Sequence, residues 1–160
     1  MRVSAKADYA VRAAAELAAS ADGRPIKRDQ LAQAQQIPAK FLESILLELK
    51  HAGIIKSTRG AEGGYSLARP AADISVADVI RAVDGPLANV RGERVEAVEY
   101  AGAARRLRDV WVAVRASLRD VLESTTLADV VSGELPAHVI ELTKRPEAWI
   151  SLNRRRRRRG

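Results

Sequence analysis

Apolar and polar residues recur with a helical period in the sequence PAKFLESILLELKHAG, which begins at Pro38. At 100° per residue the apolar side chains share one arc, formed by Phe41, Leu42, Ile45, Leu46 and Leu49. The opposite arc holds Lys40, Glu43, Ser44, Leu47 and His51. We therefore predict a helix that packs one face and presents the other. Pro38 suits its first position, and Gly53 suits a left-handed cap after its end.

The pattern then changes to that of two short strands. Residues 54–58 (IIKST) have the composition of a strand, and residues 65–67 (YSL) can return beside them. The glycine-rich loop 59–64 joins the two, with Arg59 at its mouth. This predicts a β-hairpin directly after the amphipathic helix.

Two further helices are predicted before residue 38. Ser4 can cap a first helix that ends near Asp22, with an apolar stripe on Tyr9, Ala13 and Leu17. Residues 27–35 form a second, short helix, and a tight connection leads into the helix at Pro38. A short helix, a short turn and a longer helix make a helix-turn-helix.

After the hairpin, Ser75 and Asp78 have the spacing of a capping box and open a helix that runs through Val83. The helical period returns from about residue 103 to 124. Its apolar residues span about 120° and need a partner surface; they are Leu107, Val110, Trp111, Val114, Leu118, Val121 and Leu122. Thr126 and Asp129 then start a short helix that ends at Gly133.

The predicted fold is mainly α with a small β-hairpin: a winged helix-turn-helix unit plus a long dimerisation helix. We assign residues 1–86 to the winged unit, 87–102 to a linker or flexible loop, and 103–133 to the dimerisation helix with its following short helix. Residues 134–160 are expected to be loosely structured, with a polyarginine end.

Composition narrows the function classes. The 160 residues include 47% hydrophobic ones, which is enough for a real core, and the net charge is +7. Six of those charges come from the run at 154–159, which would strengthen nonspecific binding to polyanions. No apolar run is long enough to span a membrane, and the first residues lack the apolar segment of a secretory signal, so we expect a cytoplasmic protein.

Several kinds of site are disfavoured by the residues present. The chain has no cysteine and two histidines, so we expect no metal and no cofactor. No nucleophile with an adjacent base is evident, and the glycine-rich stretch GAEGG lies in a hairpin rather than at the strand–helix junction of a phosphate-binding loop. An enzyme is therefore not expected.

Four segments together resemble the bacterial IscR/NsrR/CymR family of winged-helix transcription regulators, also called the Rrf-two family. They are MRVSAKADYAVRAAAELA, IPAKFLESILLELKHAGIIKSTRGAEGGYSLARP, ISVADVIRAVDGP and LADV after the long helix. The resemblance covers roughly residues 1–132. Its most specific part is the recognition helix joined to the wing pattern RG-x-x-GGY, which starts at Arg59.

The resemblance implies a homodimer bound to double-stranded DNA, with the recognition helix in the major groove, the wing in the minor groove and the long helix crossing its partner. Cluster-binding members carry three cysteines between the winged unit and the long helix, whereas residues 87–102 carry none. This implies the cluster-free branch, which responds to a small molecule or a protein partner. A winged-helix adaptor that binds proteins rather than DNA is the alternative.

The predicted DNA contacts fall into three groups. Lys40, Glu43 and Ser44 lie on the exposed face of the recognition helix, at whose start Pro38 and Phe41 complete the set; a plain solvated face is the alternative. Arg59 would enter the minor groove beside Gly60, Gly63 and Gly64, unless it pairs with Glu62. Tyr65 would pack partly in the core and partly against DNA. Ser4 and Lys6 would meet phosphate at a helix N-terminus, unless they form a plain cap and a solvated lysine.

Overall fold

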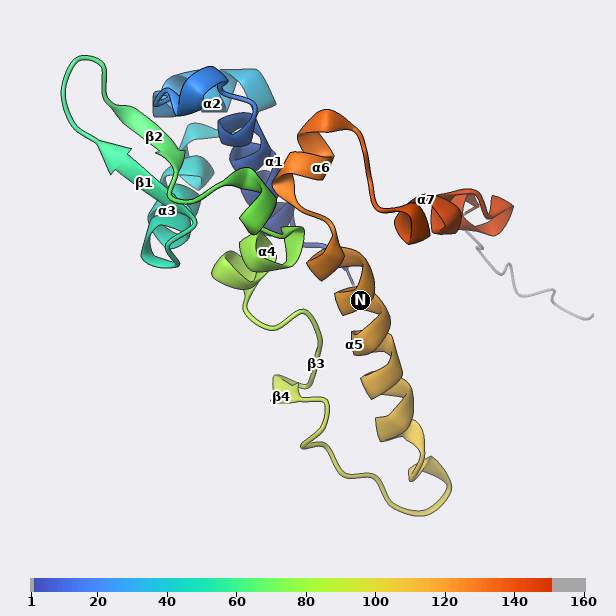
Figure 1. Ribbon diagram of the computed structural model, residues 1–160. Helices are drawn as coiled ribbons and strands as arrows, with labels where there is room; N and C mark the ends of the chain where they lie inside the picture. Colours follow the sequence, from blue (N-terminus) through green and yellow to red (C-terminus); the bar gives the residue numbers. More distant parts are fainter. Residues whose placement is uncertain (1, 151–160) are drawn as a thin grey trace, which may run out of the picture.

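The computed structural model describes residues 2–150 and shows a helical head from which one long helix extends (Figure 1). The head contains α1 (Ala5–Ala18), α2 (Arg28–Gln35), α3 (Ala39–His51) and α4 (Val76–Asp84), with the wing strands β1 (Ile55–Thr58) and β2 (Gly64–Leu67). The long helix is α5 (Leu107–Ser124), and α6 (Leu127–Ser132) and α7 (Ala137–Thr143) follow it. The predicted fold class is confirmed.

Helix α1 lies at the centre of the head. Its buried residues are mostly alanines, so the helices packed around it approach closely; they are Ala7, Ala10, Ala13, Ala14 and Leu17. Against them pack four fully buried side chains of α3, namely Leu42, Ile45, Leu46 and Leu49. The predicted Ser4 cap is present, because its hydroxyl accepts from the N–H of Ala7 at 2.9 Å. This core fixes the orientation of α3, whose other face remains open.

Two details of the α3 prediction were wrong. Phe41 does not pack in the core: its side chain is 56% exposed and lies against the ring of Tyr9 at a centroid distance of 6.3 Å. Pro38 is the N-cap rather than the first helical residue, since α3 begins at Ala39. The predicted left-handed residue after the helix is present at Gly53, whose φ is 71°.

The wing is an antiparallel hairpin that pairs Ile55 with Leu67 and Thr58 with Gly64. A second connection ties it to the segment between α1 and α2. Ile26 and Tyr65 exchange two backbone hydrogen bonds, each 2.8 Å long. The wing is therefore held near the turn end of β2 by the connection between α1 and α2, as well as by its own ladder.

Helix α6 returns to the head after α5. Both predicted capping boxes form, at Ser75 with Asp78 and at Thr126 with Asp129, and the two caps lie side by side. The N–H of Leu127 donates to the carbonyl of Ile74 at 2.9 Å, and the Leu127 side chain is fully buried in the core of the head. Although we grouped α6 with the dimerisation helix, it packs with the winged unit.

Residues 87–102 and 134–150 have more structure than the sequence indicated. The former contain the short hairpin β3 (Asn89–Val90) and β4 (Glu93–Arg94) and three buried side chains, Ala88, Val95 and Val98. The latter contain α7 and a 3₁₀ turn at Pro146–Trp149, so loose structure was the wrong expectation there. The polyarginine run lies outside the described residues.

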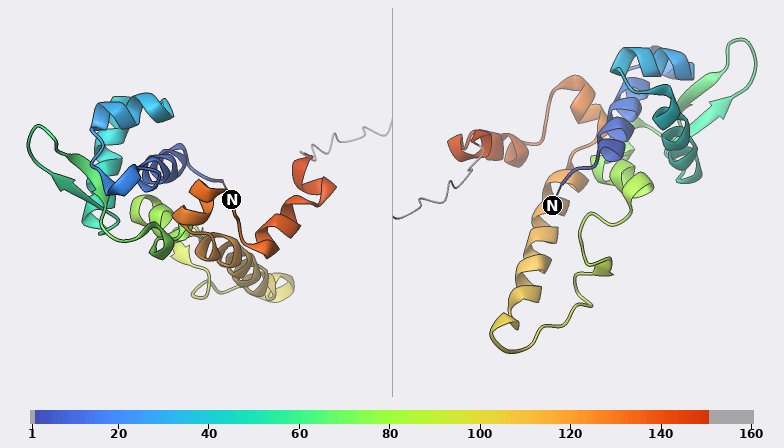
Figure 2. Two further views of the ribbon diagram at one scale, coloured as in Figure 1. Left: turned by 45° about the horizontal axis from the view of Figure 1, so that its top comes forward. Right: turned by 180° about the vertical axis from the view of Figure 1, so that it is seen from behind.

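Helix α5 begins four residues later than predicted, at Leu107, after a 3₁₀ turn at Gly102–Ala104. None of its residues is buried. In the two views of Figure 2 it extends away from the head, with its far end and the wing at opposite extremities. The chain therefore covers the apolar stripe of α5 only in part, and buries none of its residues fully.

Candidate nucleic-acid interface

The exposed face of α3 and the wing enclose a hollow of about 410 Å³. Its walls carry most of the recognition-helix residues predicted from the sequence, and they are Lys40, Glu43, Ser44, Leu46, Leu47, Lys50 and Tyr65. The structure thus brings together one helical face and one strand residue across the hollow. Tyr65 is half-buried and packs on the core while its edge lines this space.

Two lysines give the hollow its positive charge. Lys40 and Lys50 are exposed, and the side chain of neither forms a hydrogen bond or salt bridge within the described range 2–150. Lys50 was not identified from the sequence, although it follows Glu43 by seven residues and Leu47 by three. That i, i+4, i+7 pattern places it on the same face.

Glu43 faces a cation of the neighbouring helix. Arg28 of α2 approaches it with 3.8 Å between Nη1 and Oε2, and Arg28 also donates from Nε to Asp29 at 3.1 Å. The hydrogen bond to Asp29 raises the pKa of Arg28, and the charge of Glu43 adds to that effect. Glu43 is therefore placed to orient Arg28 beside the hollow, which adds a cation that the sequence did not reveal.

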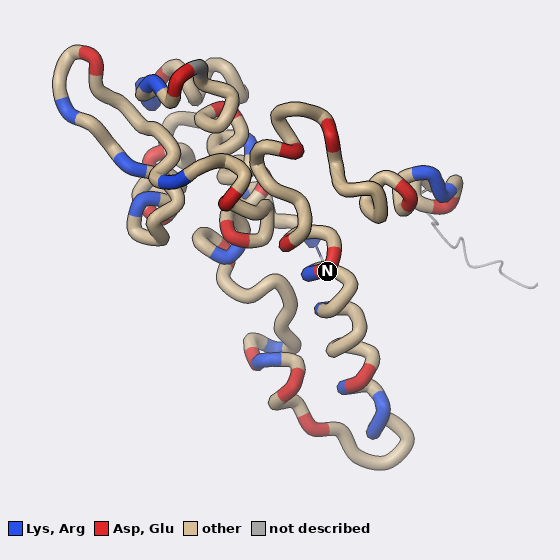
Figure 3. The backbone as a smooth tube through the Cα atoms, viewed as in Figure 1, with Lys and Arg blue, Asp and Glu red and all other residues tan. Residues whose placement is uncertain are grey.

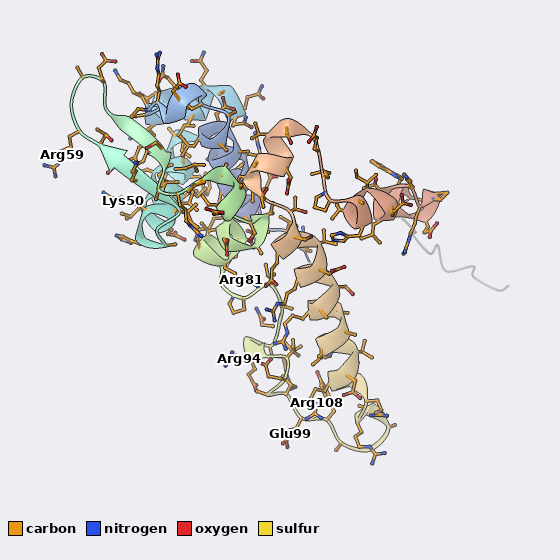
Figure 4. All side chains as sticks on the ribbon, viewed as in Figure 1. Lys50, Arg59, Arg81, Arg94, Glu99 and Arg108 are labelled. Carbon is orange, nitrogen blue, oxygen red and sulfur yellow. The ribbon has the colours of Figure 1, made fainter. Side chains whose placement is uncertain are left out.

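Arg59 is the first residue of the wing turn, and its side chain points away from the head (Figure 4). Its side chain is exposed and forms no ion pair with Glu62 or with any other residue of the described part of the chain. The alternative in which Glu62 neutralises Arg59 is not realised. Figure 3 shows the wing turn with one basic and one acidic segment, so the tip carries both signs of charge.

Glycine is required at positions 63 and 64 of the wing because other backbone atoms lie too close for a side chain. A Cβ on Gly63 would lie 2.3 Å from the carbonyl oxygen of Thr58, and one on Gly64 would lie 2.6 Å from that of Ile26. Gly60 has a φ of 103°, which favours glycine at that turn position. The three glycines thus shape the turn that presents Arg59.

Ser4 and Lys6 lie apart from this surface and are engaged within the chain. The Ser4 hydroxyl donates to Asp84 at 2.5 Å, while Lys6 Nζ donates to the Val83 carbonyl at 2.8 Å and pairs with Glu48 at 2.7 Å. These contacts favour the structural alternative for both residues. Ser44 donates to the carbonyl of Phe41 at 3.0 Å, which leaves its oxygen lone pairs available.

The chain covers the seven stripe residues of α5 to different extents, and none of them fully. Trp111 donates from Nε1 to the hydroxyl of Tyr100 at 3.0 Å, and Leu118 and Leu122 line a cavity of about 440 Å³ beside the start of α1 and the end of α4. Val110 remains 50% exposed. Leu107, Val114 and Val121 are half-buried.

Comparison with known proteins decides the family. A profile of the Rrf2 family, described as iron-dependent transcriptional regulators, matches residues 3–133. The chain belongs to the Rrf2 family. A provisionally named HTH-type transcriptional regulator of Mycobacterium tuberculosis is 55% identical over 142 residues, which cover 89% of this chain and 88% of that protein. The HTH-type transcriptional regulator CymR of Bacillus subtilis is 34% identical, over 87% of this chain and 98% of CymR.

Solved Rrf2-family structures share the fold. The structure of CymR, the global cysteine regulator of B. subtilis, superposes with a TM-score of 0.70 at 33% identity, covering 82% of this chain and 97% of CymR. IscR of T. potens gives a TM-score of 0.66 at 32% identity, covering 94% and 93%. These relatives are transcription regulators, so the chain is a winged-helix regulator rather than an enzyme.

The family description names iron, but this chain does not carry the donors for a cysteine-ligated cluster. Its sequence has no cysteine. Within residues 2–150, no three side chains of the His, Cys, Asp and Glu types are grouped so that they can hold a metal ion. In the same range, no helix is both long and apolar enough to cross a membrane.

Proposed function

We propose that the protein is a homodimeric, sequence-specific DNA-binding repressor that inserts α3 into the major groove and the wing into the adjacent minor groove. The main support for this proposal is the hollow between α3 and the wing. Its cations are exposed and unpaired within the described chain, and one helical face supplies several side chains that can reach base edges.

The dimensions support this arrangement. Helix α3 has 13 residues and is about 20 Å long, and an α-helix with its side chains is about 10 to 12 Å wide, which suits a major groove about 12 Å wide. Arg59 projects from a turn in which three of six residues are glycine, so few side chains oppose its entry into a narrower groove. Lys40, Lys50, Glu43 and Ser44 would face bases or phosphates.

The dimer rests on α5. Its 18 residues present an apolar stripe with no buried member, and the exposed Val110 and Val112 on this helix favour pairing with a second copy. A two-fold dimer would present two heads to a pseudo-palindromic site. Because the cluster donors are absent, the signal would come from a small molecule or a protein partner instead.

Two substitutions test the groove assignments. Arg59→Ala should cost about 1 to 3 kcal/mol on an operator with an A·T-rich flank and less on a G·C-rich flank, because groove width depends on sequence. Lys40→Ala should weaken binding with a penalty that varies with bases in the half-site core instead. The measurement is affinity on a matrix of operator variants at fixed salt, with the operator first located by genome-wide mapping of bound sites.

Arg108→Ala is the matched control, since it removes one exposed arginine near the far end of α5 (Figure 4). It should change affinity little on every operator. Equal losses for Arg59→Ala and Lys40→Ala on all variants would reduce both residues to phosphate contacts. No preference of the wild-type protein for any mapped site over random DNA would favour the protein-binding adaptor.

A further inference from the structure

Four arginines from three separate elements line one small cavity between the head and the long helix. Arg81 comes from α4, Arg94 from β4, and Arg115 and Arg119 from α5; Pro86, Leu87 and Ala88 complete the walls. Figure 4 shows Arg81 and Arg94 beside the loop that leads from α4 towards α5. The cavity has a volume of about 130 Å³.

Two glutamates share these four arginines. Glu123 accepts from Arg81 and, at 2.9 Å, from Nε of Arg119. Glu96 accepts from Arg115 and forms an ion pair with Arg94, with 3.3 Å between Nε of Arg94 and Oε1 of Glu96. The pKa of Glu96 is lowered by its own backbone N–H and by Arg115, and that of Glu123 by Arg81 and Arg119, so both carboxylates stay ionised. The cluster keeps an excess of two positive charges.

The two carboxylates use up neither the charge nor the donors of the four arginines. Each guanidinium has five N–H donors, whereas each carboxylate offers about four acceptor positions, so four arginines outnumber their two partners in donors as well as in charge. The four arginine side chains are 26% to 82% exposed, so an anion from solvent can reach their free donors. The surplus donors therefore suit a compact anion with several oxygens.

We propose that this cavity binds a phosphate group, and that its occupancy changes the affinity of the protein for its operator. Planar guanidinium forks match phosphate oxygens in pairs, and a phosphate monoester carries about −1.5 to −2 charges near neutral pH, which balances the surplus. A phosphate held here would join α4, which packs against α1 and α3, to α5. The regulatory half of the proposal rests on the proposed function, since it needs α3 to read DNA.

The site is tested first without DNA, by calorimetric titration of the full chain with inorganic phosphate at constant ionic strength set by chloride. Arg94→Ala should weaken phosphate binding at least tenfold, because a hydrogen bond to a charged group contributes more than the ~1.4 kcal/mol that corresponds to tenfold. Arg94 is suited to the test because its side chain is 82% exposed and contributes little packing. Arg94→Lys should also lose affinity, because it keeps the charge and removes the fork.

The control is Arg106→Ala, which removes one exposed arginine from a second arginine-lined hollow at the far end of α5. It should leave phosphate affinity unchanged. Equal affinity of wild type, Arg94→Ala and Arg94→Lys would overturn the site, as would a loss confined to Arg106→Ala. An alkyl phosphate ester titrated in parallel separates the sources: tighter binding than inorganic phosphate indicates a phosphorylated metabolite, and weaker binding indicates the free ion.

The regulatory half is tested by operator affinity with and without saturating phosphate at the same ionic strength. Wild type should shift by at least threefold, and Arg94→Ala should not shift. A phosphate that binds without changing operator affinity overturns the regulatory half alone. Failure of wild type to prefer any operator over random DNA overturns the proposed function, and the titration still decides the site.

Discussion

Replacing Gly64 by alanine should displace the wing. The new Cβ would lie 2.6 Å from the carbonyl oxygen and 2.7 Å from the carbonyl carbon of Ile26. Because non-bonded heavy atoms prefer about 3.5 to 4.0 Å, the two backbones must separate by about 1 Å. The two 2.8 Å hydrogen bonds between Ile26 and Tyr65 would then stretch beyond hydrogen-bonding range.

The magnitude follows from those two bonds. Each contributes about 0.5 to 1.5 kcal/mol, so Gly64→Ala should lower the free energy of unfolding by about 1 to 3 kcal/mol. Thermal melts at one fixed protein concentration would show a loss of about 2 to 4 °C per kcal/mol. Operator affinity should also fall, most on operators whose A·T-rich flank would receive Arg59.

Gly53→Ala separates this effect from ordinary glycine strain. Gly53 also has a positive φ, 71°, but its Cβ would meet nothing within 4 Å. The expected cost is about 1 kcal/mol of stability with no flank-dependent loss of affinity. The reasoning is refuted if Gly64→Ala melts within 1 °C of wild type and binds every operator equally well.

Two further results are expected. Val110→Glu should dissociate the proposed dimer at low micromolar concentration in sedimentation, because a buried unpaired charge costs several kcal/mol. The control Val131→Glu alters a valine of similar exposure on α6 and should leave the dimer intact. If both variants stay dimeric, α5 is not the interface. Deleting residues 154–159 should flatten the dependence of log affinity on log salt while leaving the preference for operator over random DNA nearly constant, and a collapsed preference would show that the run reads bases.

Local chemistry explains what the sequence could predict. The caps at Ser4, Ser75 and Thr126 depend on residues three positions apart, and the wing turn depends on glycines next to one another, so both are visible in the chain. The exposed face of α3 follows from the helical period alone. Membership of the family was also predictable, because the joined helix-and-wing pattern is specific.

Long-range geometry explains what the sequence could not predict. A helical projection gives the direction of each side chain but not the width of the covered arc, so Phe41 was assigned to the core. The pair Arg81–Glu123 joins residues 42 positions apart, and no periodicity connects them. The hairpin at 89–94 was missed because its strands have two residues each, too few to show an alternating pattern.

The return of α6 to the head makes α5 an insertion within a folding unit rather than an appendage after it. The head is discontinuous in sequence, since Leu127 completes a core otherwise built from residues 7–83. A fragment that ends after α4 would leave Ile74 without its backbone partner and the Leu127 site as a void, and losses of a buried leucine cost about 2 to 5 kcal/mol. A chimaera that takes its head from another family member would therefore need two junctions, one before α5 and one between α5 and α6, because the head includes residues on both sides of α5.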